Sequence, residues 1–208
     1  IGMALVMAKD FHGRGLLRAA VLVPWAIPTA ITAKLWAFLF SEQGIVNSIF
    51  HAHVAWQTDP WAARFSIILA DVWKTTPFMA LLILAGLQMI PKDLYEAARM
   101  DGANAWQRFT RITLPLAKNS IIVAVLFRML DALRMYDLPY IMVGPNPDSP
   151  TATLSQLVVA AIRQDHVNAA SALSTLIFLL IFLIALCFVK SLGSKVAHQA
   201  EPVVAEEE

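Results

Sequence analysis

The sequence predicts an all-α integral membrane protein, a polytopic bundle of membrane-spanning helices. Of its 208 residues, 58% are hydrophobic and only 15% are charged, whereas a soluble domain is usually about half apolar and about a quarter charged. Several apolar stretches also reach the roughly 20 residues that a helix needs to cross the hydrocarbon layer. They are too long and too apolar to be strands of a membrane barrel. The predicted spans are residues 16–40, 63–90, 119–143 and 167–189.

The chain is expected to be one transmembrane domain over residues 1–208, incomplete at its N-terminus. Its opening residues, IGMALVMA, are apolar but too short to span, so they are expected to be the end of a helix that begins earlier. No basic leader or cleavage site accompanies them, which argues against a signal peptide. Pro24, Pro28 and Pro77 fall inside predicted spans, where neighbouring groups can satisfy the freed carbonyls.

The Lys and Arg residues in the segments that connect the predicted spans, the first of which is 16–40, indicate which side of the membrane each segment faces. Segments 9–18, 91–118 and the tail 190–208 hold ten of these residues, whereas 41–64 and 144–166 hold only Arg64 and Arg163. Basic residues in short loops favour the cytoplasmic side. This distribution predicts that residues 91–118 and the C-terminus are cytoplasmic. Four tryptophans are candidates to anchor the bilayer interface: Trp25, Trp36, Trp56 and Trp61.

Residues 91–118 form a polar segment between the second and third complete spans. Small and apolar residues recur there at helical spacing, which predicts two short helices. Gly102 lies between them, where a helix commonly ends in a left-handed turn that only glycine adopts without strain. From the residues alone, the segment is either a helix that docks on another protein or an amphipathic linker. Glu96 and Arg99 could pair with each other or with a partner.

The same segment carries a family motif. Glu96-Ala97-Ala98, Gly102 after three residues, and Ile112-Thr113-Leu114-Pro115 after nine more resemble the EAA loop of ABC-importer permeases. The resemblance implies a helical bundle of the type I, MetI-like importer kind and a coupling helix seated in a groove of an ATP-hydrolysing subunit. The residues that it places in this contact are Glu96, Ala97, Ala98, Asp101, Gly102, Ile112, Leu114 and Pro115.

The chain lacks the G-x-x-x-x-G-K-[ST] phosphate loop. We therefore expect no enzymatic activity and no bound cofactor in this chain, with ATP and Mg on a partner ATPase subunit. The resemblance implies further partners in a bacterial cell membrane: a second homologous permease subunit, an extracytoplasmic solute-binding protein or lipoprotein, and lipid. No nucleic-acid partner is expected. His51 and His53 have no further ligands at metal-binding spacing, so no metal site is predicted.

Charged residues inside the predicted spans have two interpretations. Charges near the bilayer centre are costly and normally face the bundle interior or an aqueous path. Asp71 and Lys74 lie in 63–90, and charges of alternating sign recur every three residues in 119–143. They could hold helices together as ion pairs, line a translocation path, or do both. The alternating set is Arg128, Asp131, Arg134 and Asp137.

Helical spacing selects candidates for a path. Asp71, Thr75 and Phe78 share one helical face, and Asp131, Arg134 and Met135 are neighbours on another. Carboxylates can accept sugar hydroxyls and an aromatic ring can cover a pyranose, so these groups suit a hydroxyl-rich solute. If the carboxylates instead carried protons, the chain would be a proton-coupled secondary transporter that uses Asp71 or Asp131.

Residues 23–50 and 134–162, together with the final span, resemble maltose-type carbohydrate permeases. The loop VGPNPDSP departs from the glycine-rich loop of that family. The resemblance implies a sugar as the solute, either a disaccharide such as trehalose or maltose, or a glycerol-phosphate-like compound. It also implies that five of the six residues chosen above by spacing lie along the sugar's route: Asp71, Thr75, Phe78, Asp131 and Met135.

Overall fold

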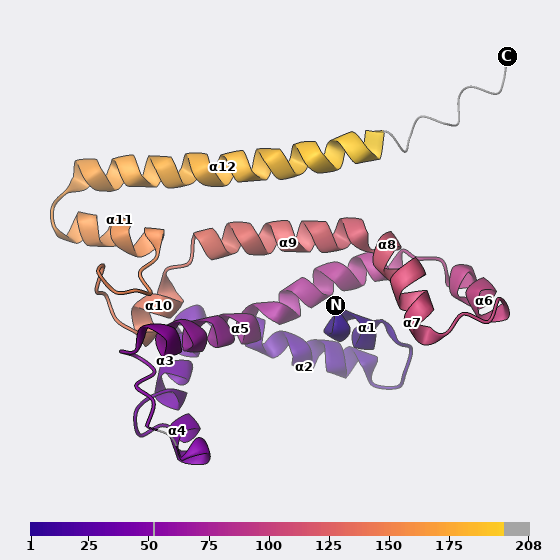
Figure 1. Ribbon diagram of the computed structural model, residues 1–208, viewed down its shortest axis with the longest axis horizontal. Helices are drawn as coiled ribbons and strands as arrows, with labels where there is room; N and C mark the ends of the chain where they lie inside the picture. Colours follow the sequence, from indigo (N-terminus) through magenta and orange to yellow (C-terminus); the bar gives the residue numbers. More distant parts are fainter. Residues whose placement is uncertain (52, 198–208) are drawn as a thin grey trace.

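The computed structural model describes residues 1–51 and 53–197, with residues 191–197 as backbone alone. Within these ranges the chain is made of helices and connecting turns without any strand, so the all-helical prediction is confirmed. Four long helices run along the molecule in alternating directions (Figure 1). They are α2 (Arg14–Ala26), α5 (Pro60–Gln88), α9 (Lys118–Leu133) and α12 (Val167–Ala197).

Helix α5 is the central element, since it contacts α1 (Gly2–Ala8), α2, α3 (Thr29–Leu39), α9 and α10 (Asp137–Met142). Its start is fixed by Asp59, whose carboxylate accepts hydrogen bonds from the backbone N–H groups of Trp61 and Ala62 at 3.0 and 2.8 Å. Pro60 follows at the first turn, where its missing N–H is not needed. The helix then runs for 29 residues through Pro77. The predicted span 63–90 is therefore one continuous helix to within a few residues.

The predicted span 16–40 is broken in the structure. Helix α2 ends at Ala26 and α3 begins at Thr29, with their axes bent by 85°. Pro28 cannot donate a backbone hydrogen bond and fixes its own φ, which favours a break here. Lys74 Nζ from α5 donates to the carbonyl oxygen of Ile27 at 2.6 Å, so the carbonyl freed by the break gains a charged donor. Our expectation of an unbroken span missed this side-chain cap.

The predicted span 119–143 is also divided. Helix α9 ends at Leu133, three residues form a turn, and α10 follows as a separate short helix packed on α3. Pro139 is one of the first residues of α10 and is almost fully buried. The run of charges at three-residue intervals therefore does not continue as one helical face past Arg134.

Helix α12 extends beyond the predicted span 167–189, since its backbone stays helical to Ala197. The predicted tail 190–208 thus begins inside a helix, and residues 198–208 lie outside the described residues. None of the most apolar 18-residue window of this helix is buried among the described residues. Its only extensive contacts within that part of the chain are with α9 and α11 (Leu154–Arg163).

Two apolar cores lie at opposite ends of α5. One joins α1, α5 and α9 through residues such as Met7, Leu84 and Ala124. The other joins α3, α5 and α10 through residues such as Phe40 and Leu138. The first core lies at what we call the α6 end of the molecule, after α6 (Lys92–Met100), and the second lies at the α4 end, after α4 (Ile45–Phe50). Figure 1 shows them at opposite ends of the long axis.

Three of the four tryptophans predicted as interface anchors make defined contacts within the chain, and the interface role itself stays a prediction. Trp56 donates its indole N–H to the buried side-chain oxygen of Asn47 at 2.7 Å. Trp36 stacks on Phe40, and Trp25, which is 48% exposed, stacks on Phe78. Trp61 remains an exposed candidate for an interface anchor. The sequence did not distinguish these roles, because aromatic rings satisfy both cores and interfaces.

Candidate functional site

The polar segment 91–118 folds as two helical pieces around Gly102. The first is α6, and it ends in the turn geometry in which a left-handed residue closes the helix. Gly102 has a φ of +78°. Its N–H donates to the carbonyl of Arg99 at 3.0 Å, and the next N–H, from Ala103, donates to Ala98 at 2.9 Å. This pair of bonds fixes the angle at which the chain leaves α6.

The second piece is built from three consecutive turns: α7 (Ala105–Arg108), the π-helical turn η1 (Phe109–Thr113) and α8 (Leu114–Leu116). Asn104 and Gln107 cap its start reciprocally, each side chain bonding the other's backbone N–H at 2.9 and 2.8 Å. Pro115 lies in the first turn of α8, next to the π turn. The piece passes into α9 with a bend of 65°.

The two pieces are held together across the turn. Tyr95 in α6 and Thr113 in η1 share a hydrogen bond of 3.0 Å between their hydroxyls, and the Thr113 side chain is buried. Arg108 additionally donates to the carbonyl of Ala103. Backbone caps and side-chain bonds together make the segment a braced element rather than a loose connector.

The outward side of the segment combines an acid with exposed apolar side chains. Glu96 and Ala97 are exposed, and Glu96 forms no ion pair with any residue that the structure describes, Arg99 included. Met100 is 90% exposed and Trp106 is 71% exposed. Met100 lies one turn after Glu96 on the same face of α6, and an exposed apolar side chain of this size beside a free carboxylate is typical of a protein interaction surface.

The motif residues divide into outward and inward groups. Ala98 and Ile112 are half-buried and pack within the segment, while Gly102 forms the turn. The other five are exposed: Glu96, Ala97, Asp101, Leu114 and Pro115.

A second candidate region lies between the long helices. A polar cavity of about 160 Å³ is formed by α5, the end of α9 and the turn before α10. An aromatic cavity of about 390 Å³ lies against it and is lined by α2, α5, α9 and α12. Thr75, Asp131 and Arg134 line both. We call the two together the central cavities. All six residues predicted from spacing line one or both: Asp71, Thr75, Phe78, Asp131, Arg134 and Met135.

An ion-pair network connects α5 and α9 beside these cavities. Arg128 contacts the carboxylate of Asp71, which is buried, and donates to Asp131 at 3.0 Å. The guanidinium group of Arg128 thus forms ion pairs with two carboxylates. Arg134 lines the cavities without an ion pair to the described part of the chain. Asp71 and Arg128 therefore form an ion pair between helices, and Asp71, Asp131 and Arg134 line the cavities. That the cavities form a translocation path stays a prediction.

Two lining residues were not among the predicted ones. Trp25 stacks on Phe78 with ring centroids 5.1 Å apart and planes 9° from parallel. Lys74 lines the polar cavity while capping the end of α2. The signal that could have found Trp25 is its place between Pro24 and Pro28, because a broken span exposes side chains to the bundle interior. No group of three or more His, Cys, Asp or Glu that could hold a metal occurs among the residues described.

Residues 1–198 match the sequence profile of a family described as "Binding-protein-dependent transport system inner membrane component". The chain is 44% identical over 195 residues to the trehalose/maltose transport system permease protein MalF of Thermococcus litoralis, covering 91% of this chain and 66% of the relative. It is 39% identical over 196 residues to the trehalose transport system permease protein SugA of Mycobacterium tuberculosis, covering 93% and 63%. The chain thus spans about two thirds of the length of these curated relatives.

A solved structure has a similar fold. Its title describes a bacterial alginate ABC transporter in complex with an alginate pentasaccharide-bound periplasmic protein. The TM-score is 0.78 at 26% identity, over 89% of this chain and 67% of that chain.

Proposed function

Because the chain belongs to the family of binding-protein-dependent transport system inner membrane components, we propose that it is the transmembrane subunit of an ATP-driven sugar importer. In this role it forms half of a translocation pathway and receives mechanical work through residues 91–118. The observation that carries the proposal is the braced polar segment, whose outward side presents the unpaired Glu96 with exposed apolar neighbours. Such a surface needs a partner protein, and an importer supplies one in its ATPase subunit.

Mechanical coupling follows from how the segment is joined to the long helices. It connects α5 directly to α9, and the bond between Tyr95 and Thr113 holds its two pieces together. A displacement of α6 is therefore passed to both helices instead of being lost in a flexible loop. The two helices carry Asp71 and Asp131 beside the central cavities, so their movement changes the shape of the route. ATP can bias that change only if the partner contacts α6 differently in the two states.

The solute that best fits the central cavities is a neutral sugar. Three carboxylates and two cations line the polar cavity, and Arg128 beside it adds a third cation, so the charges balance. Hydroxyl groups can bond such side chains, and the stacked Trp25 and Phe78 offer an aromatic surface for a pyranose. The names of the relatives MalF and SugA contain trehalose or maltose. We infer a disaccharide of that kind rather than a glycerol-phosphate-like solute.

The assembly that this role requires has four kinds of component. ATP and Mg would be held by a separate ATP-binding subunit, and this chain would bind no cofactor. A second, homologous permease would complete the pathway, and an extracytoplasmic solute-binding protein or lipoprotein would deliver the sugar to the α4 end. The chain is a multi-pass membrane protein. We propose that residues 91–118 and the C-terminus face the cytoplasm.

The alternative of a proton-coupled secondary transporter is less well supported by the charges. A proton carrier must be able to exchange its proton with water. Asp71 is buried and forms an ion pair with Arg128. Asp131 shares the same arginine. The alternative predicts uptake that stops with an uncoupler and needs no ATPase subunit.

The proposal is tested with the Glu96→Lys variant in the full-length permease, reconstituted with its partner subunits. We expect the complex to assemble but to lose most of its solute-stimulated ATPase activity, because the charge at the docking surface is reversed. Asp93→Lys is the matched control, with the same charge change one turn earlier in α6. Stimulation that is unchanged in the Glu96 variant, or lost equally in both variants, would contradict a specific coupling role.

A further inference from the structure

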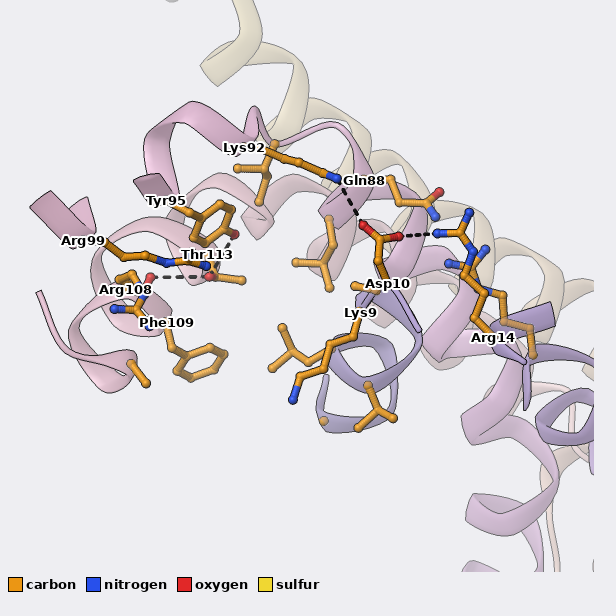
Figure 2. A pocket seen from close by; sticks show the side chains of 18 residues that line it. Lys9, Asp10, Arg14, Gln88, Lys92, Tyr95, Arg99, Arg108, Phe109 and Thr113 are labelled. Atoms are coloured by element: carbon orange, nitrogen blue, oxygen red, sulfur yellow. Dashed lines mark hydrogen bonds and ion pairs between the residues drawn. The ribbon is translucent and has the colours of Figure 1, made fainter. Parts of the chain in front are cut away.

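A half-open cavity of about 810 Å³ lies at the α6 end. It is lined by α1, the turn between α1 and α2, the end of α5, and the polar segment. Figure 2 shows Tyr95, Thr113 and Phe109 on one side of the opening and Lys9 and Asp10 on the other. The cavity thus separates the first hairpin of the chain from the proposed coupling helix.

The cavity has a large surplus of positive charge. Six of its lining residues are Lys or Arg and only one, Asp10, is acidic. Asp10 is shared by Arg14 and Lys92, and the hydrogen bond from Lys92 lowers the pKa of its carboxyl, so it stays charged at neutral pH. Lys9 and Arg99 have no ion pair among the described residues. The charges of the cavity therefore call for an anionic ligand.

The remaining lining is apolar, which restricts the kind of anion. Leu5 and Val6 of α1, Leu87 and Ile90 near the end of α5, and Phe109 of η1 lie beside the cations. A small hydrated anion would gain no binding free energy from the apolar lining. An amphiphile can place its charged group on the cations and its apolar chain on the apolar lining. The position at the ends of spanning helices also matches the depth of lipid headgroups. Basic pockets between such helices on the cytoplasmic side are suited to acidic phospholipids.

We propose that this cavity binds an anionic phospholipid, with the phosphate between Lys9 and Arg99 and the adjoining acyl region on Leu5 and Val6. The proposal rests on the proposed function only for the placing of the α6 end at the cytoplasmic surface. A bound phosphate would join the α1–α2 turn to α6, adding to the bridge that Asp10 already makes between Arg14 and Lys92. Lipid occupancy would thereby stiffen the connection between the bundle and the coupling helix.

The test measures the thermal unfolding midpoint of the purified full-length complex in an uncharged detergent, without solute or ATP. The probes are dioctanoyl phosphatidylglycerol, dioctanoyl phosphatidylcholine and inorganic phosphate. A ligand that binds the folded state raises the midpoint. We expect the anionic lipid to do so at concentrations where the other two do not. Because neither solute nor ATP is present, the result is independent of whether the chain transports a sugar.

The site is assigned with paired variants. Lys9→Gln with Arg99→Gln should need roughly thirtyfold more phosphatidylglycerol for the same shift, since two phosphate contacts are lost. Arg111→Gln with Lys118→Gln removes the same charge outside the cavity and should behave as wild type. Lys9→Arg with Arg99→Lys keeps the charge and should retain binding, which separates lost contacts from misfolding.

Four results would overturn the proposal. The first is equal stabilisation by phosphatidylcholine, and the second is equal stabilisation by inorganic phosphate, which would indicate a site for a soluble anion. The third is an unaltered response of the Lys9 and Arg99 glutamine variant. The fourth is binding to the isolated permease that disappears in the assembled complex, because the cavity would then belong to the ATPase interface.

Discussion

The crossing of α5 and α9 beside the polar segment depends on Gly86. A Cβ atom at this position would lie 1.9 Å from Ser120 Oγ and 2.4 Å from Ser120 Cβ. Neither distance is possible without movement, and the Ser120 Cβ is too close to its own backbone to swing aside. We therefore predict that Gly86→Ala forces the two helices apart where they enter the polar segment.

The expected magnitude combines two opposing effects. Overpacking of this kind destabilises by about 1–3 kcal/mol, while alanine favours a helix over glycine by about 1 kcal/mol. Because both distances are far below van der Waals contact, the upper part of the overpacking range applies, about 2–3 kcal/mol. The net loss is then about 1–2 kcal/mol, or a fall of roughly 2–8 °C in the unfolding midpoint for a chain of this size. Solute-stimulated ATPase activity should fall as well, because both ends of the coupling element are displaced.

The assay is thermal unfolding of the full-length chain in detergent, followed by ATPase stimulation in the reconstituted complex. Gly15→Ala is the matched control, since no atom lies within 4 Å of its added methyl group. It should leave the midpoint unchanged or slightly raised. Gly86→Ala combined with Ser120→Gly removes both clashing atoms and should recover most of the loss. If Gly86→Ala alone unfolds at the wild-type temperature, the close approach of the two helices is refuted.

Three further changes have defined outcomes. Arg128→Gln leaves the buried Asp71 carboxylate uncompensated and should destabilise by about 3–5 kcal/mol; adding Asp71→Asn should restore most of it in the same unfolding assay. Asn47→Ala removes the partner of the Trp56 indole N–H and of two carbonyls, so a loss of about 1–3 kcal/mol is expected; an unchanged midpoint would count against it. Gly102→Ala strains a residue at φ +78° by about 1–2 kcal/mol and should lower ATPase stimulation. Gly102→Asn should be milder, and equal effects would contradict the left-handed turn.

The fold class was predictable because the lengths of the apolar stretches and the positions of the charged residues can be read directly from the sequence. The helix break at Gly102 was predictable for a similar reason, since a local rule connects glycine to a left-handed turn. The elbow between α2 and α3 was not predicted. Pro28 gave the signal, but whether a proline kinks or divides a span depends on what satisfies the freed carbonyls. Here the donor is Lys74, 47 residues away along the chain.

The candidate site was predictable in part. Helical spacing correctly placed Asp71, Thr75 and Phe78 along one side of α5, and these three face the central cavities. Spacing could not show that Trp25 stacks on Phe78, because that contact joins two different helices. Nor could it show that Arg128 bridges two carboxylates, since the partner Asp71 lies 57 residues earlier.

The position and partner of the polar segment are tested most directly by labelling at Met100, the last residue of α6, which is 90% exposed. In a Met100→Cys variant with Cys187→Ser, the introduced thiol should react with a membrane-impermeant maleimide only from the cytoplasmic side. Binding of the ATPase subunits should slow that reaction several-fold. Reaction from outside intact cells, or a rate that the ATPase subunits do not change, would contradict the coupling role of residues 91–118.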